Sequence, residues 1–274
     1  MIEPLTPAQL DAYCQRIGHS GPRAADRATL TALHRAHVLA VPFENLDVQL
    51  GRPLSTDSHA AYAKLVGARR GGWCYEQNGV FARALVALGF AVTRMSGGVM
   101  RALRGEAAMG SHLCLRVTVE GQEYLADVGF GSTQLEPVPL AEHDWDQVPM
   151  AGAVQRTDDG LWQFAIHSGP MPLSYDFHPE PADEALLARM CEWQASDAES
   201  IFVQNLVVQQ RLPQGHLMLR GKVLTETTPA GSHDRELASG EELVDLLRTR
   251  FGLDLPEAAG LWPAIEARHA ALFG

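Results

Sequence analysis

The sequence predicts an α+β protein in which a helical first part, a β-rich middle part and a mixed last part follow one another. Apolar residues recur at helical spacing up to Gly89, alternate or run in short stretches from Phe90, and show both patterns after Pro181. With 274 residues, 46% of them hydrophobic and 20% charged, the chain has an ordinary globular composition and can form a substantial core. Its length allows one large domain or about two to three small ones.

Four helical patterns make up the first part. They cover residues 7–17, 28–40, 57–67 and 75–88. The end signals are clearest for the first pattern, where Thr6 is the expected N-cap, Pro7 takes the first helical position and Gly18 ends the helix. The fourth pattern has an apolar face that includes Phe81 and ends at Gly89, a residue suited to the end of a helix. We therefore expect a helical first part.

The middle part contains short stretches that are typical of strands. They are AVTRM, HLCLRVTV, EYLADVGF and LWQFAI, and clusters of Gly, Pro and Asp separate them. Between the second and the third stretch, Glu120 and Gly121 form a plausible two-residue hairpin turn. This turn would pair the two strands in an antiparallel ladder.

The last part mixes helical and strand patterns. It contains a helix at EALLARMCEW, strands at FVQNLVVQQRL and HLMLRGKVLTE, and a final helix from Leu261 to Leu272. Before the final helix, Ser239 and Glu242 have the spacing of a capping box, and Gly252 ends the helix that they begin.

The charge balance argues against several kinds of partner. Lys and Arg number 22 and Asp and Glu number 33, so the formal net charge is -11 and nucleic acid is a poor partner. The start, MIEPLTPAQLDAY, lacks the basic and apolar regions of a signal peptide, and ALVALGFAV is too short to span a bilayer. We expect a soluble cytoplasmic protein with no membrane partner.

The four cysteines, Cys14, Cys74, Cys114 and Cys191, lie far apart and form no C-x-x-C pair. This spacing suggests neither a zinc ribbon nor a disulfide framework, so we expect free thiols and no metal. A free cysteine is more often a small core residue than a reactive one. A functional cysteine therefore needs further signals in the sequence around it.

Cys74 has such signals in the stretch RGGWCYEQN, Arg70 to Asn78. Gly71 and Gly72 allow a tight backbone entry, and the expected helix runs on from Tyr75, so the cysteine lies at a helix N-terminus. Unpaired N–H groups and the positive end of the helix dipole favour the thiolate there, and they can also donate hydrogen bonds to an oxyanion.

A reactive thiolate needs a base and a group that orients the base. In HLCLRVTVEGQEYLADV, strand alternation puts His112, Cys114 and Arg116 on one face, and the hairpin register places Cys114 opposite Asp127. His112 is then the diagonal neighbour of Asp127 on the same face, where the carboxylate can set its tautomer and stabilise imidazolium. A register slip of one residue would break this pairing.

Each of these two residues also has a plain structural interpretation. His112 is one of 11 histidines and could be a partly exposed strand residue, and Asp127 could be a turn residue before Gly129. Together they are better explained as a pair, because an aspartate at the end of the apolar strand YLADV is costly to bury without a partner.

Four motifs, RGGWCYEQN, SHLCLRV, DVGFG and the earlier VPFENLD, resemble in order and spacing the signature segments of the arylamine N-acetyltransferases. The resemblance extends over most of the chain, and the four motifs together are highly specific. It implies a catalytic triad of Cys74, His112 and Asp127, similar to the triads of cysteine proteases and transglutaminases. In this triad Cys74 would take an acetyl group from the co-substrate acetyl-CoA and pass it to an amine.

The resemblance also implies three domains. They are a helical bundle over residues 1–90 that carries the nucleophile, a β-barrel over 91–195 that carries the histidine and the aspartate, and an α/β lid over 196–274. The triad would span the first two domains. Such an enzyme acts on foreign aromatic amines and hydrazines and needs no metal.

An aromatic acceptor needs a flat apolar slot. The aromatic candidates to line it are Phe43, Trp73, Tyr75, Phe130 and, more weakly, Phe202. Core packing is the alternative interpretation, and we favour it for Trp73. The resemblance implies that Gly129 and Gly131, on either side of Phe130, let the backbone approach the pantetheine arm of coenzyme A. No phosphate-binding loop is present in the sequence, so contacts to the nucleotide end are not assigned.

Two departures from the family pattern keep related functions open. This chain has GPMPLSYDF where many relatives have a tryptophan before Leu-Tyr-x-Phe, and ASDAES where many have Ser-Thr-Ser-Pro. One alternative is an amide synthase of the same fold that closes a macrolactam from a carrier-bound acyl chain. Another is a Cys-His-Asp hydrolase. A non-catalytic binding module would need neither the cysteine nor the histidine.

Overall fold

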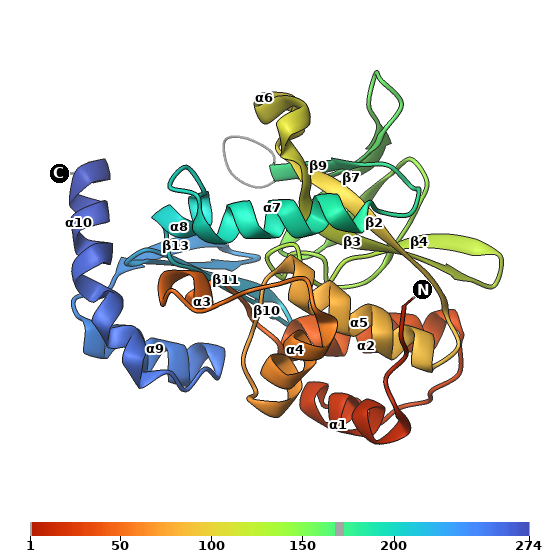
Figure 1. Cartoon of the computed structure of the whole chain (residues 1–274), viewed down its shortest axis with the longest axis horizontal. Helices are drawn as coiled ribbons and strands as arrows, with labels where there is room; N and C mark the ends of the chain where they lie inside the picture. Colours follow the sequence, from red (N-terminus) through yellow and green to blue (C-terminus); the bar gives the residue numbers. More distant parts are fainter. Residues whose placement is uncertain (1, 168–172, 274) are drawn as a thin grey trace.

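The computed structural model describes residues 2–167 and 173–273 and shows a mixed molecule of helices and two sheets (Figure 1). Helices dominate the first part, as predicted. They are α1 (Pro7–Ile17), α2 (Arg27–Ala40), α3 (Leu46–Gln49), α4 (Ser58–Tyr62), a π-helical turn (Ala63–Gly67) and α5 (Cys74–Ala87). In the described ranges, no helix is long and apolar enough to cross a membrane.

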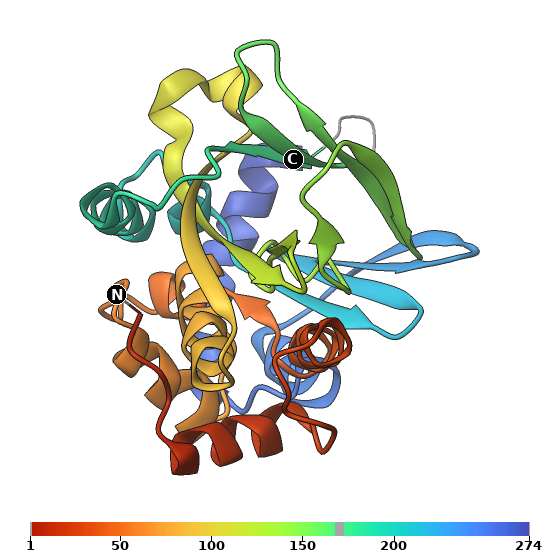
Figure 2. The same cartoon turned by 90° about the vertical axis from the view of Figure 1, so that its right-hand side faces the viewer.

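An eight-stranded antiparallel sheet forms the middle of the chain and curls towards a barrel (Figure 2). Its strand order is β5-β4-β3-β2-β9-β8-β7-β6. The strands are β2 (Ala91–Val99), β3 (Met109–Val119), β4 (Gln122–Ala126), β5 (Val138–Pro139), β6 (His143–Gln147), β7 (Met150–Arg156), β8 (Trp162–Ile166) and β9 (Leu173–Phe177). Helix α6 (Arg101–Arg104) and a 3₁₀ turn (Gly105–Ala108) connect β2 to β3. Of the departure GPMPLSYDF, residues 169–172 lie outside the described residues.

A second sheet, of five strands, joins the first part of the chain to the last. Its order is β1 (Phe43–Glu44), β10 (Val207–Leu212), β11 (Gly215–Arg220), β12 (Val223–Thr228) and β13 (Gly231–Glu236). In β1, Phe43 pairs with Gln209 and Glu44 pairs with Val208. The strand β1 is an addition to the predicted helices of the first part, because the extended residues after α2 complete the edge of a sheet whose other strands come much later.

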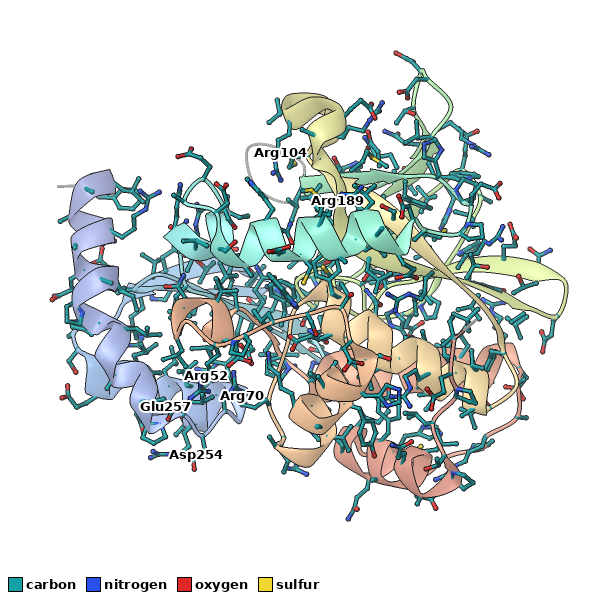
Figure 3. The ribbon with its side chains drawn as sticks, viewed as in Figure 1. Arg52, Arg70, Arg104, Arg189, Asp254 and Glu257 are labelled. Atoms are coloured by element: carbon teal, nitrogen blue, oxygen red, sulfur yellow. The ribbon has the colours of Figure 1, made fainter. Side chains whose placement is uncertain are left out.

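Polar contacts add to this link between the first and last parts. Arg52 Nη2 lies 2.6 Å from Glu257 Oε1. Figure 3 shows Arg52 and Glu257 close to Arg70, below the second sheet. The pair is largely exposed, so it contributes little stability by itself.

The last part contains further helices. They are α7 (Glu184–Ser196), α8 (Ile201–Gln204), α9 (Gly240–Phe251), a 3₁₀ turn (Pro256–Leu261) and α10 (Trp262–Phe273). The prediction of one strand over FVQNLVVQQRL is wrong in its first half. Ser200 caps α8 by accepting the N–H of Phe202, and the strand begins only at Val207. A capping serine directly before an apolar run was the signal for this helix.

The N-terminus of α9 differs from the prediction in one contact. Ser239 caps the helix by accepting the N–H of Glu242, as expected. The carboxylate of Glu242 accepts the N–H of Ala238 and not that of Ser239, so the reciprocal half of the capping box is replaced by a bond one residue earlier.

The two faces of β3 belong to two different apolar clusters. Leu115 and Val117 pack with the helices of the first part, whereas Cys114 packs inside the curled sheet. This confirms the predicted alternation. It also means that β3 is buried on both sides, so the interpretation of His112 as a partly exposed residue is wrong.

Candidate active site

Cys74 is the first residue of α5, and the backbone before it is tightly packed. A Cβ atom at Gly71 would lie 2.4 Å from the carbonyl oxygen of Pro42, and one at Gly72 would lie 2.7 Å from a carboxylate oxygen of Glu76. Only glycine fits at both positions. The Glu76 carboxylate also accepts the N–H of Trp73, at 3.2 Å. These contacts fix the direction in which the chain enters the helix.

A cluster of buried charges lies beneath the start of α5, and the sequence reasoning did not foresee it. Lys64 Nζ lies 2.8 Å from Asp47 Oδ2 and 2.9 Å from Glu76 Oε2. Arg70 Nη2 lies 2.8 Å from Glu44 Oε1. Burial raises the pKa of Glu76 to about 7, although the charge of Lys64 lowers it. The cluster ties VPFENLD to RGGWCYEQN through side chains and not only through β1.

The hairpin between β3 and β4 has the predicted register. Glu120 and Gly121 have φ angles of 53° and 75°, as a two-residue turn with two left-handed residues requires. The ladder ends with Leu115 opposite Ala126, so Asp127 directly follows the last paired residue. His112 Nε2 lies 2.6 Å from Asp127 Oδ2, and both side chains are buried. The contact predicted from the sequence is confirmed.

His112 and Asp127 each stabilise the charged form of the other. Burial lowers the pKa of His112, but the negative charges of Asp127 and Cys74 outweigh it and raise this pKa to about 10. Burial raises the pKa of Asp127, but the charge of His112 and the hydrogen bonds to the carboxylate bring it below its usual range. The pair is therefore an imidazolium and a carboxylate at neutral pH. Because Nε2 of His112 contacts Asp127, Nδ1 is the ring nitrogen that is left to bond the Cys74 sulfur.

Asn78 organises the site and was not among the predicted residues. Its Nδ2 donates to Asp127 Oδ1 at 2.8 Å and to the carbonyl of Leu113 at 2.7 Å. Its Oδ1 accepts the N–H of Val128. Asn78 lies one helical turn after Cys74 and in the same motif, and that spacing could have revealed it. It links α5 directly to Asp127.

Two aromatic rings hold the imidazole of His112. Its centroid lies 4.5 Å from that of Tyr175 and 5.2 Å from that of Phe130, which it meets edge-on. Phe130 was expected near the site and lies there. Tyr175, on β9, was not predicted, because no local pattern connects this strand to the hairpin. The rings leave the imidazole little freedom to turn away from Asp127.

A second aromatic group packs in the same apolar cluster as Cys74. The ring of Phe202 lies 5.8 Å from that of Trp73 and 6.0 Å from that of Phe43. Tyr75 is different: it is fully buried, and its hydroxyl donates to the carbonyl of Gly110. The structure therefore brings Phe43, Trp73 and Phe202 together, while Tyr75 supports Trp73 from within the core, with ring centroids 5.4 Å apart.

The glycines on either side of Phe130 are required by contacts within the protein. A Cβ atom at Gly129 would lie 2.6 Å from the Cα atom of Cys74. One at Gly131, whose φ is +59°, would lie 1.9 Å from Gln209 Oε1. This close packing is sufficient to explain both glycines. Their contact with a pantetheine arm stays a prediction.

All four cysteines are free and buried. Burial is the main cause that raises the pKa of Cys14, of Cys114 and of Cys191 above the usual thiol range. These three sulfurs therefore remain thiols at neutral pH. Cys74 alone of the four has an imidazolium beside it.

Comparison with known proteins gives a consistent result. A model of the N-acetyltransferase family matches residues 26–259. Arylamine N-acetyltransferases from Mycolicibacterium smegmatis and Escherichia coli K12 are each 34% identical to this chain, over 92% and 93% of it and 94% and 92% of their own lengths.

Solved structures agree with the sequence relatives. The arylamine N-acetyltransferase from Salmonella typhimurium matches with a TM-score of 0.84 at 30% identity, over 96% of this chain and 100% of that one. The Mycobacterium marinum enzyme in complex with CoA matches with a TM-score of 0.84 at 27% identity, over 94% and 97%. With a cysteine, a histidine and an aspartate gathered at the start of α5, the chain is an acyltransferase that belongs to the arylamine N-acetyltransferase family.

Proposed function

We propose that Cys74, His112 and Asp127 form a catalytic triad that moves an acetyl group from acetyl-CoA to an arylamine or arylhydrazine through a cysteine thioester. The observation that carries the proposal is the buried contact of 2.6 Å between His112 and Asp127, beside the helix N-terminus that bears Cys74. A buried imidazolium next to a thiol is the arrangement that activates a cysteine nucleophile.

In the first step, the Cys74 thiolate attacks the carbonyl carbon of the acetyl group. The bond from this carbon to the coenzyme A sulfur breaks, and the coenzyme leaves as a thiol with the proton of the His112 imidazolium. One thioester replaces another, so the exchange is close to balanced. The N–H groups of Cys74 and Tyr75, at the first two positions of α5, can donate to the oxyanion that forms on the carbonyl oxygen.

In the second step, the amine nitrogen attacks the acetyl carbon, and neutral His112 accepts the proton that the nitrogen loses. The bond to the Cys74 sulfur breaks, which releases the amide and restores the thiolate and imidazolium. Asp127 holds the imidazole in one tautomer through both steps. Arylamines and arylhydrazines suit this step because they are weak bases and are largely unprotonated at neutral pH, unlike most alkylamines.

The acceptor slot in this proposal lies between two aromatic groups, one on each side of Cys74. Phe43, Trp73 and Phe202 form one wall, with Tyr75 behind Trp73, and Phe130 forms the other wall beside His112. Coenzyme A would reach the thiol past Gly129 and Gly131. The CoA complex of the Mycobacterium marinum relative supports this co-substrate.

The proposal keeps three domains, over residues 1–90, 91–195 and 196–274, with the last acting as a lid on the other two. The pairing of β1 with β10 and the position of Phe202 against Trp73 support a covering role for the last domain. No step of the proposed mechanism requires a metal ion.

Brief mixing with acetyl-CoA alone tests the proposal. Peptide mass spectrometry should find one acetyl group, on the peptide that contains Cys74, and an arylamine or arylhydrazine should then remove it as the acetylated product. Cys74→Ala should abolish labelling, whereas Cys14→Ala, Cys114→Ala and Cys191→Ala should keep it.

The same experiment separates the alternatives. Labelling only by a carrier-bound acyl chain would instead identify an amide synthase that closes macrolactams. Peptide cleavage without labelling by any thioester would identify a hydrolase. Labelling of Cys114 or Cys191 in preference to Cys74 would contradict the assignment of the nucleophile.

A further inference from the structure

Phe202 is the outermost member of the aromatic wall beside Cys74. Trp73 and Phe43 are buried, whereas Phe202 is partly exposed and meets the Trp73 ring edge-on at an interplanar angle of 71°. It lies on α8, a helix of only four residues. So short a helix has little stability of its own, and other contacts must fix the ring.

Two amide side chains from VPFENLD and the following α3 hold the backbone of α8. Gln49 Nε2 donates to the carbonyl oxygens of Phe202 at 2.6 Å and of Val203 at 3.0 Å. Asn45 Nδ2 donates to the carbonyl oxygens of Phe202 and Asn205, both at 2.8 Å. The carbonyl of Phe202 thus accepts hydrogen bonds from both side chains.

Asn45 is also bound at its other end. Its Oδ1 accepts the N–H of Val207 at 2.7 Å, directly where β10 begins. The side chain is buried, so each of its polar atoms needs a partner within the protein. Asn45 therefore spans the segment from Phe202 to Val207 and fixes where α8 ends and β10 starts.

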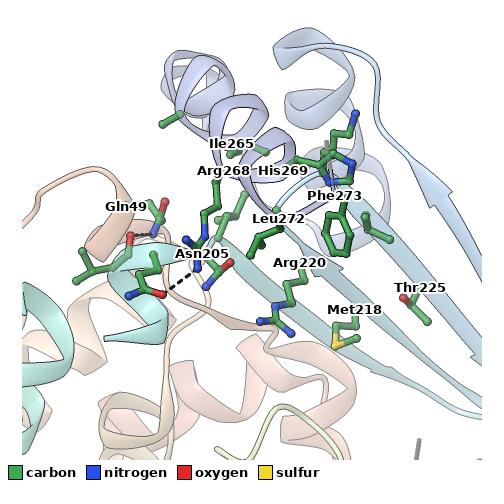
Figure 4. A pocket seen from close by; sticks show the side chains of 17 residues that line it. Gln49, Asn205, Met218, Arg220, Thr225, Ile265, Arg268, His269, Leu272 and Phe273 are labelled. Atoms are coloured by element: carbon green, nitrogen blue, oxygen red, sulfur yellow. Dashed lines mark hydrogen bonds between the residues drawn. The ribbon is translucent and has the colours of Figure 1, made fainter. Parts of the chain in front are cut away.

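The far side of this segment borders a cavity, where Arg268 of α10 donates a hydrogen bond to Gln204 Oε1. Gln49, Val203, Gln204 and Asn205 line one wall of a cavity of about 430 Å³. Figure 4 shows Gln49 and Asn205 at this wall, with Leu272 and Phe273 of α10 at another. On the cavity side α8 is bound to α10 through Gln204, whereas the backbone at Phe202 itself is held by the hydrogen bonds from Asn45 and Gln49.

We propose that Asn45 and Gln49 are positioning residues for the amine acceptor, which act through Phe202 by holding its ring against Trp73 and so setting the width of the slot. The inference rests on the proposed function in one respect, that the acceptor binds beside Phe202. Loss of these bonds frees α8 to move into the cavity and widens the slot. The acetyl-CoA half of the reaction does not depend on them.

Gln49→Ala is the primary test, because Gln49 is only half-buried and its removal threatens the fold less than that of Asn45. We expect kcat/KM for an arylamine to fall about ten-fold, the loss of one to two hydrogen bonds, while kcat/KM for acetyl-CoA stays unchanged. In a two-step mechanism each of these constants reports its own half of the reaction. Equal losses in both constants would overturn the proposal.

Two further variants show whether the amide donors matter. Gln49→Met keeps the length of the side chain without its N–H groups, so it should behave like Gln49→Ala, and a normal kcat/KM for the arylamine would overturn the proposal. Gln204→Ala is the matched control. Gln204 lines the same cavity as Gln49 and lies on α8 with Phe202. Its side chain bonds Ala198 and Arg268 and not the Phe202 carbonyl, so this variant should keep both constants.

A double variant tests whether Gln49 acts through Phe202. In a Phe202→Ala background, adding Gln49→Ala should cause no further loss in kcat/KM for the arylamine. If the losses in kcat/KM from Phe202→Ala and Gln49→Ala add in the double variant, Gln49 does not act through Phe202 and the proposal is overturned. Formation of the acetyl-enzyme on Cys74 is measured in every variant by mass spectrometry. Its absence in the wild-type protein would refute the proposed function itself, which distinguishes that failure from the failure of this inference.

Discussion

Asp127 uses its two carboxylate oxygens for different contacts. Oδ2 holds the ring of His112, while Oδ1 accepts hydrogen bonds from Asn78 and from the N–H of Gly129. The contacts at Oδ1 fix the carboxylate to α5 and to its own loop. Because Oδ2 of this fixed carboxylate contacts Nε2 of His112, it also fixes the orientation of the imidazole. Asp127 therefore supplies both the counter-charge and the orientation of His112.

The variant Asp127→Asn separates charge from shape. We expect it to fold, because the amide has nearly the same size, and to form the acetyl-enzyme more slowly by on the order of 10³- to 10⁴-fold, because the imidazolium loses its counter-charge and its tautomer. Single-turnover mixing with acetyl-CoA followed by mass spectrometry measures this rate. Circular dichroism provides the check on folding. A folded variant that acetylates at the wild-type rate would leave the aspartate only a structural role.

The same pair makes stability depend on pH. Against the effect of burial, the charges of Asp127 and Cys74 raise the pKa of His112 to about 10 in the folded protein, whereas a histidine in an unfolded chain has a pKa of about 6.5. The folded state therefore binds this proton more tightly. The contribution is complete below about pH 6.5 and is lost as the pH rises through about 10.

Urea unfolding of the wild-type protein and of His112→Gln with reduced thiols checks this expectation. The difference in unfolding free energy between the two proteins should shrink from about pH 7 to about pH 10. Comparing the two cancels the contribution of the other cysteines, whose thiols also titrate in this range. A difference that stays constant with pH would mean that His112 is not held as imidazolium.

The sequence was sufficient to predict the contact of His112 with Asp127, but not Asn78 or Tyr175. A two-residue turn fixes the register of a hairpin, so a diagonal contact across it follows from counting residues. Asn78 and Tyr175 reach the site from α5 and β9, and only the packing of distant elements brings them there. The position of Asn78 one helical turn after Cys74 marks it as a candidate, but no local pattern identifies the partners of Asn78 or of Tyr175.

At the scale of elements, the loop after β4 and the start of α5 touch each other through Gly129. A Cβ atom there would meet the Cα atom of Cys74 at 2.6 Å and the side chain of Asn78 at 2.7 Å. The Cα atom of Cys74 cannot move without shifting the helix, and the Asn78 side chain is held by its bonds to Asp127 and Leu113. The absence of a side chain at Gly129 thus lets the loop after Asp127 contact the helix that begins at Cys74.

The variant Gly129→Ala should therefore lower both stability and acylation. We expect a loss of about 1–3 kcal/mol in the free energy of unfolding, as in other overpacked sites, and slower labelling of Cys74. Urea titration and acetyl-CoA labelling measure the two effects. Gly67→Ala is the control, since a Cβ atom at Gly67 meets nothing within 4 Å. Equal unfolding free energies and labelling rates in the two variants would show that the loop at Gly129 can move to accommodate a side chain.

Elements were predictable where a local signal was strong. The Thr6 cap, confirmed by reciprocal bonds with Gln9, and the β3–β4 turn are of this kind. The run FVQNLVV is apolar in a way that suits helix and strand equally, and its division into α8 and β10 depends on Asn45, far away in the sequence. The exposed, polar strand β13 shows no alternation at all.

At the scale of the whole molecule, the last part of the chain depends on the first. Phe43 and Glu44 form the edge strand of the second sheet, and Leu46 lies in the apolar cluster between that sheet and α9. Asn45 holds the beginning of β10. The C-terminal sheet therefore lacks an edge, a core residue and a restraint when residues 43–46 are missing.

We expect a fragment of residues 196–274, produced alone, to remain largely unfolded by circular dichroism and amide hydrogen exchange. The reason is that a small sheet without its full core buries too little apolar surface to offset the entropy of folding. The same fragment joined by a flexible linker to residues 41–50 should gain protected amides. A lone fragment with cooperative unfolding would show that this part is self-sufficient.

The pairing of β1 with β10 also sets the order of events during synthesis. Phe43 and Glu44 leave the ribosome long before their partners Val208 and Gln209. At about 5–20 residues per second the delay is roughly 10 to 30 s. A nascent chain therefore carries Cys74 early but gains Phe202 only near the end of translation. Ribosome-bound chains stalled before Val207 should lack arylamine acetylation even though the cysteine, histidine and aspartate have all emerged.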